Sequence, residues 1–349
     1  MELFAGAGGL SLGAEIAGLK VAVAVEKSAA AANTYRSNHS ETQVICDDVR
    51  SVDPLGFCLP SEQLILFGGP PCQGFSTSNQ RTRGKDNPNN WLFEEFLRYV
   101  VLLNPQIVVF ENVSGLVHTA RGYFLEELIS RLAKLGYYVS YAVLDAIRSG
   151  VPQKRNRFFC VGSKTKLITL ENSLGNDTVT TVHEAIHDLP LLISGSTDDE
   201  LPYRTSAKSD YAQKLRGNSN TSTGHLVTKN AKHIVERYSH IPQGGNWSSI
   251  PAKLMGTYKD ASRCHTGIYK RLEENAPSIV LGNFRKNMLV HPTQDRGLSV
   301  REAARIQSFP DTYLFSGSIG QQQQQVGNAV PPLMAATVFK SILQQLSVS

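Results

Sequence analysis

The first 165 residues alternate short β-branched runs with segments of helical periodicity, and this rhythm limits the fold more than any other feature. The runs are VAVAVE at 21–26, LILFGG at 64–69, IVVFEN at 107–112 and FFCVG at 158–162. The expected helices lie at 10–18, 28–38, 92–103 and 122–135. Because alternating strands and helices build a mostly parallel sheet with both faces covered, the sequence predicts a doubly wound α/β fold.

From about residue 165 the sequence becomes polar and rich in Ser, Thr, Asn and Gly, as in GNSNTSTGH at 217–225. Helical periodicity returns at 299–309, and a proline pair begins a last apolar helix at 330–346. The glutamine run 321–325 is interpreted as a solvated connector. The change of composition predicts a second, smaller domain or a long insertion.

The cysteines favour a reducing compartment and no metal. They are odd in number, widely spaced and without a C-x-x-C pair: Cys46, Cys58, Cys72, Cys160 and Cys264. No stretch approaches the roughly 18 uninterrupted apolar residues of a membrane span, and the N-terminus shows no signal-peptide pattern. We therefore expect a soluble intracellular protein.

Positive charge is concentrated in one part of the chain. The net charge is +5, but residues 201–292 hold 14 Lys and Arg against 5 Asp and Glu, so this stretch carries +9 and the remainder −4. A localised basic surface is typical of proteins that meet phosphate backbones. A basic, solvated loop region would give the same count.

A glycine-rich turn, FAGAGG at 4–9, stands between a stub of strand and a helix. Its glycines permit a tight turn and let backbone N–H groups approach a ligand. Such a turn serves NAD, FAD, S-adenosylmethionine or merely close packing. Glu26, which ends the second strand about 20 residues further on, is placed to accept both hydroxyls of a ribose, which favours a nucleotide-type cofactor.

The segment GGPPCQGFS at 68–76 follows a predicted strand, so Cys72 lies at the carboxyl end where open α/β sheets bind ligands. Most single cysteines are simply small buried hydrophobes. Here two glycines and two prolines fix the backbone around one thiol, which favours a nucleophile.

Glu111, in ENV at 111–113, ends the next strand at the same sheet edge. A half-buried carboxyl there can have a raised pKa and act as an acid, or it can be a helix N-cap or an ion-pair partner.

The segment QKRNR at 153–157 precedes the last of these strands, and alternation puts Gln153, Arg155 and Arg157 on one face, opposite Lys154 and Asn156. An arginine on that face could hold a carbonyl or a phosphate, or could pair with Glu111.

Taken together, these motifs resemble the C5-cytosine DNA methyltransferases, and they stand in that family's order. The elements are FAGAGG, GGPPCQGFS, ENV, QKRNR, VREAARIQSFP at 300–310 and GNAVPP at 327–332. Only about 190–265 is left without a family motif. The family usually has Asp before Leu-Phe where this chain has Glu2, with almost no strand before it, so we expect the first strand to be short.

The resemblance implies S-adenosylmethionine as methyl donor, S-adenosylhomocysteine as product and no metal. Phe4 would stack on the adenine, Glu26 would hold the ribose, and Asp48 would accept from the adenine amino group, with Asp47 as a competing choice. The residues implied to bind the cofactor are Phe4, Ala5, Gly6, Gly8, Gly9, Glu26, Asp48, Val49, Pro70, Leu92, Asn328 and Ala329.

The implied catalytic residues are Cys72, Glu111, Arg155 and Arg157. Cys72 would add to C6 of a cytosine that has swung out of the duplex, Glu111 would contact N3 and the exocyclic amine, and Arg157 would bind O2. Residues 76–90 would close as a lid over the base or form a surface loop. The residue that removes the C5 proton is not identified, and a water would serve.

The resemblance also implies a division of labour. Residues 1–185 and 326–349 would form the catalytic domain, 186–297 a target-recognition domain and 298–325 a hinge. The partner would be duplex DNA, bound by a monomer in a bacterial cytoplasm, with no membrane and with a restriction endonuclease as a separate companion. The residues we consider for base-edge contacts are Asn218, Asn220, Tyr258 and Arg263.

Three alternatives compete. An RNA cytosine methyltransferase of the tRNA-modifying type would carry a Cys-Phe-Thr tripeptide, which this sequence lacks, and a smaller recognition region, so DNA is favoured. A silent DNA-binding homologue would usually lack the nucleophile or the cofactor glycines. A nicotinamide dehydrogenase would leave Pro-Pro-Cys-Gln unexplained.

Overall fold

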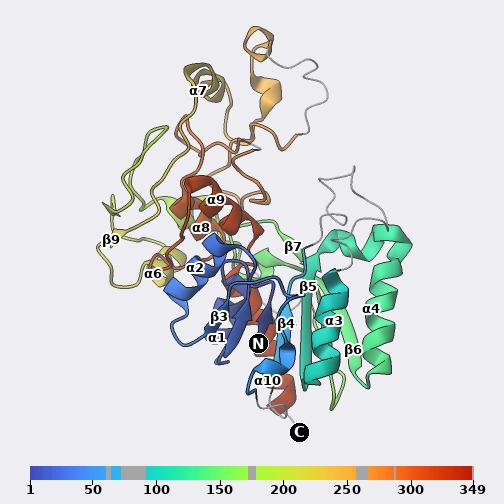
Figure 1. Cartoon of the computed structure of the whole chain (residues 1–349). Coiled ribbons are helices and arrows are strands. Elements are labelled where there is room, and N and C mark those ends of the chain that lie inside the picture. The colour runs from blue at the N-terminus through green and yellow to red at the C-terminus, as the bar shows by residue number, and fades with distance from the viewer. Residues whose placement is uncertain (60–63, 72–91, 172–177, 257–265, 287, 348–349) are drawn as a thin grey trace. The chain divides into compact units, whose positions relative to one another are not determined.

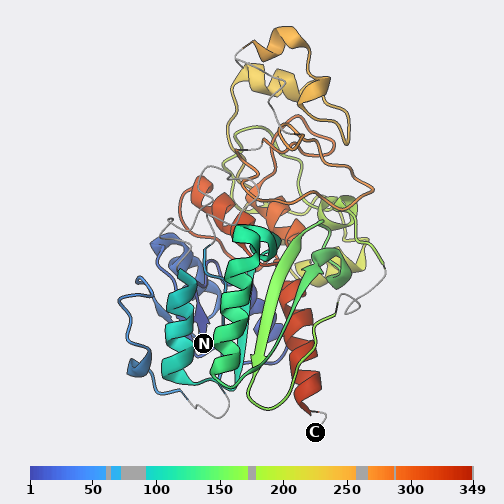
Figure 2. The same ribbon diagram turned by 90° about the vertical axis from the view of Figure 1, so that its right-hand side faces the viewer.

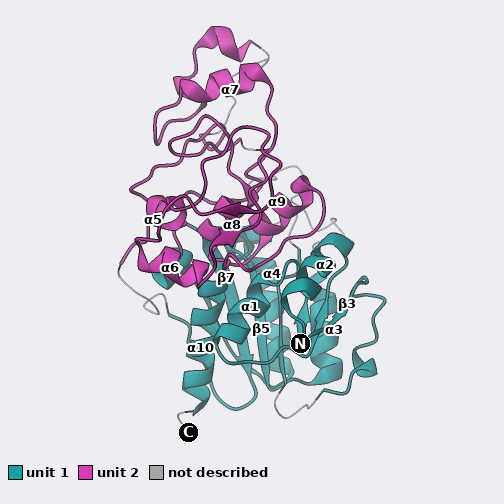
Figure 3. Ribbon diagram, turned by 90° about the vertical axis from the view of Figure 1, so that its left-hand side faces the viewer, with its two compact units in different colours: residues 1–149, 155–176, 332–349 teal, residues 150–154, 177–331 magenta. Residues whose placement is uncertain are grey.

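The computed structural model describes residues 1–349 except 60–63, 72–91, 172–177, 257–265, 287 and 348–349. The chain divides into two compact units (Figure 3). Unit 1 consists of Met1–Ser149, Arg155–Asn176 and Pro332–Ser349, and unit 2 consists of Gly150–Lys154 and Asp177–Pro331. The two units are defined by how compactly their residues pack, and they carry no information on function. The expected boundaries between catalytic, recognition and hinge segments, at residues 185, 297 and 325, therefore stay a prediction.

Unit 1 is built on a seven-stranded sheet of order β3-β2-β1-β4-β5-β7-β6 (Figure 1). The strands are β1 (Glu2–Leu3), β2 (Val23–Val25), β3 (Gln43–Ile45), β4 (Ile65–Gly68), β5 (Ile107–Val113), β6 (Tyr138–Asp145) and β7 (Asn156–Ser163). The pairs from β3 to β5 are parallel, whereas β7 is antiparallel to both β5 and β6. The mostly parallel α/β fold is confirmed, together with the four expected strands and the short first strand.

Helices cover both faces of this sheet. They are α1 (Gly9–Ile16), α2 (Ala29–Asn38), α3 (Leu92–Leu103), α4 (Tyr123–Lys134) and α10 (Pro332–Ser347). Alternation along β4 separates the faces, because Leu66 belongs to the core shared with α3 and α4, while Phe67 meets Phe339 of α10 with ring centroids 5.1 Å apart. Figures 1 and 2 show α3 and α4 side by side, joined by an edge-to-face contact between Phe93 and Phe124.

The chain changes its direction of crossover between β1 and β4. From β1 it moves outward to β2 and β3, and from β4 it moves to β5 on the other side. Leu3 pairs with Gly68 here, and a Cβ on Gly68 would lie 2.2 Å from the Leu3 carbonyl oxygen, so only glycine fits. Because open α/β sheets bind ligands beside such a point, the turns that follow β1 and β4 form the expected binding edge.

Close packing of α1 on α10 depends on Gly13. A Cβ on Gly13 would lie 2.3 Å from the Ala335 Cβ and 2.7 Å from the Ala336 nitrogen. By length and composition alone, the stretch Ile319–Ser347 could cross a membrane, but 72% of its most apolar window is buried within the protein. We interpret this stretch as core.

Unit 2 has short elements and is held together by buried arginines. Its elements include α5 (Val182–Ile186), β8 (Leu201–Pro202), α6 (Asp210–Arg216), β9 (Thr221–Ser222), α7 (Lys232–Ser239), α8 (Val300–Ile306) and α9 (Ile319–Asn328). Arg305 donates to both carboxylate oxygens of Asp311 at 2.7 Å, and Arg296 forms a two-point pair with Glu302 at 2.6 and 2.8 Å. The helix expected at 299–309 is confirmed as α8, which starts with a capping box.

The interpretation of the glutamine run as a solvated connector is wrong. Residues 321–325 lie in α9, which begins with a capping box formed by Ser318 and Gln321. Three of the five glutamines are buried, namely Gln322, Gln323 and Gln325. Their hydrogen-bond partners lie outside the run, so composition alone could not reveal them.

We expect Gly13→Ala to lower the stability of the protein. Helix propensity favours Ala over Gly by about 1 kcal/mol, but overpacking against α10 costs typically 1–3 kcal/mol, so the net change should be a loss of up to about 2 kcal/mol, measured by urea unfolding. Gly56→Ala is the control, since a Cβ there meets nothing within 4 Å. Equal stability of the two variants would show that α1 and α10 are not packed this closely.

Candidate functional site

The glycine-rich turn after β1 has a left-handed backbone at three positions. The φ angles are 56° at Phe4, 55° at Gly6 and 84° at Gly8, and Gly8 caps α1. The Ala5 N–H donates to the Val25 carbonyl oxygen at 3.1 Å, which ties the turn to β2. A Cβ on Gly6 would meet none of the described residues within 4 Å, so as far as the structure describes the chain the backbone of this turn is accessible to a ligand.

Glu26 closes this turn from the end of β2. One carboxylate oxygen accepts from the Gly6 N–H at 2.8 Å, and the other accepts from the Ser28 N–H at 2.7 Å. A carboxylate oxygen has two lone pairs, so each oxygen can still accept one hydroxyl. The arrangement fits the two hydroxyls of a ribose, as predicted for Glu26, and it also makes Glu26 a support of the turn itself.

A buried carboxyl group lies behind the turn. Glu2 is 2% exposed, the Ser11 hydroxyl donates to its carboxyl group, and the Tyr35 hydroxyl donates to Ser11 Oγ at 2.6 Å. Burial raises the pKa of Glu2 to about 8, so it is mostly neutral at pH 7. Glu2 is thus a mostly neutral acid that is hydrogen-bonded to α1 through Ser11 and, through Ser11, to Tyr35 of α2. It stands where the C5-cytosine DNA methyltransferases usually have Asp.

Asp48 is already bound by two cations. Lys27 donates to Oδ2 at 2.8 Å, and Arg50 donates to Oδ1 at 2.9 Å and to Oδ2 at 2.6 Å. Hydrogen bonds from Arg50 and Lys27 hold the pKa of Asp48 well below its usual range. An adenine amino group would have to share these oxygens, whereas Asp47 is exposed, so the choice between Asp48 and Asp47 stays open.

Three other residues predicted to bind the cofactor lie in unit 1. Val49 is buried in the core, and its carbonyl oxygen accepts from Arg98 at 2.8 Å. Pro70 is buried after β4, and Leu92 begins α3. Asn328 and Ala329 belong to unit 2, where they end α9. Cofactor contact by each of these residues stays a prediction.

The turn after β4 is fixed against the end of β5. A Cβ on Gly69 would lie 2.5 Å from Glu111 Oε2, so the carboxyl group lies directly on the Gly69 backbone. Asn112 donates to the Pro70 carbonyl oxygen at 3.3 Å and uses its own oxygen to accept from the Val113 N–H. Asn112 stands in the ENV element, but no role was predicted for it from the sequence. Cys72 itself lies outside the described residues, as do 76–90, Tyr258 and Arg263.

The antiparallel register of β5 and β7 brings Glu111 and Arg157 together. Glu111 pairs with Phe159, and Arg157 lies two residues from Phe159 on the same face. Arg157 Nε lies 2.9 Å from Glu111 Oε1, which confirms the ion pair that was one of the open possibilities. Arg155 is also buried, and Lys154 and Asn156 are exposed, so the predicted alternation is confirmed.

Burial raises the pKa of Glu111, although Arg157 and Arg155 oppose the shift. Glu111 is 8% exposed and Arg157 is 9% exposed, so neither charge is well hydrated. A buried carboxyl whose pKa is raised in this way holds a proton more readily than an exposed one, which suits an acid that acts on a base nitrogen.

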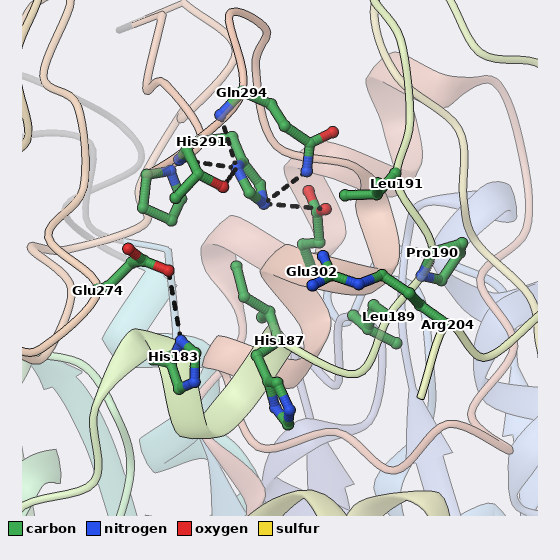
Figure 4. A pocket seen from close by; sticks show the side chains of 13 residues that line it. His183, His187, Leu189, Pro190, Leu191, Arg204, Glu274, His291, Gln294 and Glu302 are labelled. Atoms are coloured by element: carbon green, nitrogen blue, oxygen red, sulfur yellow. Dashed lines mark hydrogen bonds and ion pairs between the residues drawn. The ribbon is translucent and has the colours of Figure 1, made fainter. Parts of the chain in front are cut away.

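A separate cavity of about 170 Å³ lies in unit 2 (Figure 4). In its wall His291 Nδ1 accepts from the backbone N–H groups of Thr293 and Gln294, so its proton is on Nε2, 3.5 Å from Glu302. Burial lowers the pKa of His291 to about 4. Burial works against the charge of Glu302, yet Arg296 and His291 lower its pKa to about 2. We interpret these groups as part of the polar framework of unit 2.

A family model described as C-5 cytosine-specific DNA methylase matches residues 1–344. The Type II methyltransferase M.DdeI of Desulfomicrobium norvegicum is 32% identical over 98% of this chain and 88% of its own length. The Type II methyltransferase M1.HphI of Haemophilus parahaemolyticus is 34% identical over 99% of this chain and 86% of its own length.

Solved structures agree with this fold. A prophage-encoded protein of E. coli, assigned as a DNA modification methyltransferase, is similar with a TM-score of 0.81 and 26% identity, over 99% of this chain and 98% of its own. The S. pombe Dnmt2 methyltransferase has a TM-score of 0.66 at 14% identity, over 99% of this chain and 98% of its own, a likeness that shows the fold alone.

We expect Glu26→Ala to weaken S-adenosylmethionine binding, because it removes two ribose acceptors and the support of Gly6 together. Losing hydrogen bonds to a charged group corresponds to a roughly ten- to hundredfold higher Kd, or slightly more, by calorimetry. Glu41→Ala is the control, since Glu41 forms only an exposed pair with Lys20. Unchanged cofactor affinity in Glu26→Ala would remove Glu26 from the site.

Proposed function

Because the chain belongs to the C-5 cytosine-specific DNA methylase family and is a DNA (cytosine-5-)-methyltransferase, we propose that it methylates C5 of a flipped-out cytosine in a specific duplex sequence, through a covalent bond between Cys72 and C6. The observation that carries this proposal is the ion pair of Glu111 with Arg157 beside the Gly69–Pro70 turn, which leads directly to Cys72. A stacked base cannot reach such a site, so the cytosine must leave the duplex.

The turn after β1 fits the proposed cofactor. S-adenosylmethionine, when bound, supplies an electrophilic methyl group on its sulfonium. Glu26 offers two acceptors for the ribose, the left-handed turn offers backbone N–H groups, and Phe4, which is half-buried beside the core, offers a ring. We expect the remaining predicted residues, among them Asp48 or Asp47 and Asn328, to complete the binding.

The proposed chemistry uses a temporary bond because cytosine C5 is a poor nucleophile. The Cys72 thiolate adds to C6, and the electron pair of the C5–C6 double bond becomes available for C5 to take the methyl group. Loss of the C5 proton, to a water, then restores the double bond and breaks the S–C6 bond, which returns the thiolate. No net oxidation or reduction takes place.

Glu111 and Arg157 are proposed to make the addition possible. Attack at C6 pushes electron density toward N3 and O2 of the ring. Glu111, whose raised pKa favours the protonated form, would donate to N3 and accept from the exocyclic amine, while Arg157 would turn part of its guanidinium to O2. Because the pair is already assembled in a poorly hydrated site, little reorganisation accompanies the reaction. Arg155, buried beside Arg157, is proposed to assist.

Recognition is proposed to reside in 186–297, which contains the whole +9 stretch at 201–292. Lys and Arg there would contact phosphates and set the register, and exposed polar residues such as Asn218 and Asn220 would contact base edges. We propose a monomer that acts on duplex DNA in a bacterial cytoplasm, as the modification half of a restriction system whose endonuclease acts separately. The Type II methyltransferases among the relatives support this setting.

The test of the chemistry is a duplex with 5-fluorocytosine at the target. Fluorine at C5 cannot leave as a proton, so a complex stable to denaturant should accumulate with S-adenosylmethionine and should be absent in Cys72→Ser. Cys46→Ser, which changes an exposed thiol, should trap normally. Trapping through another cysteine, or full turnover by Cys72→Ser, would overturn the assignment.

The division of labour is tested by exchange of segments. Since the chemistry on cytosine is the same at every site, the catalytic residues hold no information on neighbouring bases. Replacing about 190–290 with the matching segment of a related enzyme should transfer that enzyme's target sequence, read by bisulfite sequencing of host DNA. An active chimera that kept the original target would place recognition in the catalytic segments.

A further inference from the structure

Three amide side chains form a line on the outer side of α9 in unit 2. Gln324 Nε2 donates to Asn328 Oδ1 at 2.7 Å, one helical turn further on. Asn283 Nδ2 in turn donates to Gln324 Oε1 at 3.2 Å. The Gln324 amide therefore accepts a hydrogen bond from Asn283 through its oxygen and donates one to Asn328 through its NH₂ group.

These contacts determine which end of the Asn328 amide is offered to a ligand. A carboxamide has one accepting oxygen and one donating NH₂ group. Because Gln324 already donates to the Asn328 oxygen, that oxygen is turned toward Gln324 and the NH₂ group is turned away from it, toward a ligand. Such a group suits an oxygen acceptor, such as a carboxylate or a ribose hydroxyl, and does not suit a cation.

The first member of the line is anchored by backbone packing. A Cβ on Gly327 would lie 2.0 Å from the Gly282 carbonyl oxygen, so the last turn of α9 lies directly on the backbone next to Asn283. The same backbone is fixed from the other side, because the Leu281 N–H donates to Gln153 Oε1 at 3.0 Å. Asn283 therefore has a defined position from which to hold Gln324.

Gln324 differs from its neighbours in the glutamine run. The other four glutamines act elsewhere: Gln321 in the capping box, Gln322 on the Gly317 carbonyl oxygen, Gln323 on Thr228 and Gln325 on the Ser316 carbonyl oxygen. The run is thus a set of separate contacts, and within the described residues Gln324 is the one of the five that donates to Asn328.

We propose that Gln324 is a positioning residue that, held by Asn283, orients the Asn328 amide to donate to an oxygen of S-adenosylmethionine. This inference rests on the proposed function, in which Asn328 binds the cofactor. It gives the glutamine run a role in cofactor affinity. It also connects the recognition segment, to which Asn283 belongs, with a cofactor-binding residue through two hydrogen bonds.

The test uses Gln324→Met, which keeps the length of the side chain and removes both hydrogen bonds. In the full-length protein, calorimetry with S-adenosylhomocysteine should show an about three- to tenfold higher Kd. The KM for S-adenosylmethionine should rise by a similar factor, while kcat and the KM for DNA stay unchanged. Gln321→Met is the matched control, since it breaks the capping box of the same helix without touching Asn328.

A double-mutant cycle separates positioning from general stability. If Gln324 acts through Asn328, then adding Gln324→Met to Asn328→Ala should weaken binding no further. Additive effects, or equal loss in Gln321→Met, would overturn the inference. If wild-type protein and all variants fail to bind S-adenosylhomocysteine, the proposed function fails with it; if Asn328→Ala weakens binding and Gln324→Met does not, only the inference fails.

Discussion

The pairing of β1 with β4 is the constraint on which the rest of the site depends. At Leu3 and Gly68 the two backbones approach so closely that no side chain fits between them. Because the chain leaves β1 and β4 in opposite directions, this contact brings the glycine-rich turn and the Gly69–Pro70 turn to one edge of the sheet. The site therefore arises from sheet topology, and the local motifs supply the chemistry.

The second constraint is the antiparallel strand β7. A wholly parallel sheet would have carried the arginines of QKRNR to the opposite edge, whereas the reversed direction places Arg157 beside Glu111. A buried ion pair adds little net stability because desolvation opposes the attraction. The pair is more readily explained by the proposed chemistry, in which Glu111 contacts N3 and Arg157 contacts O2 of the base.

How far the sequence could predict the structure differs between local and distant contacts. Periodicity predicted β2, β4, β5 and β7 and the helices between them, because β-branched runs and amphipathic segments follow the local backbone. It did not single out β3 or β6. The partner of Glu111 stayed undecided, since register is set by pairing across 46 residues of chain between Glu111 and Arg157. The glutamine run was misinterpreted for the same reason: Gln323 bonds to Thr228, 95 residues away.

Unit 2 combines a fixed interior with exposed loops. Its interior is fixed by arginines whose donors reach several segments at once, as Arg271 does with the carbonyl oxygens of Tyr238, Ile241 and His291. Breaking such a buried network would leave polar groups without hydrogen bonds, which would lower the stability of the fold. The interior of unit 2 is therefore held in one arrangement. Asn283 lies next to the tightly packed Gly282 backbone, and its side chain also contacts Gln324 on the exposed side of α9.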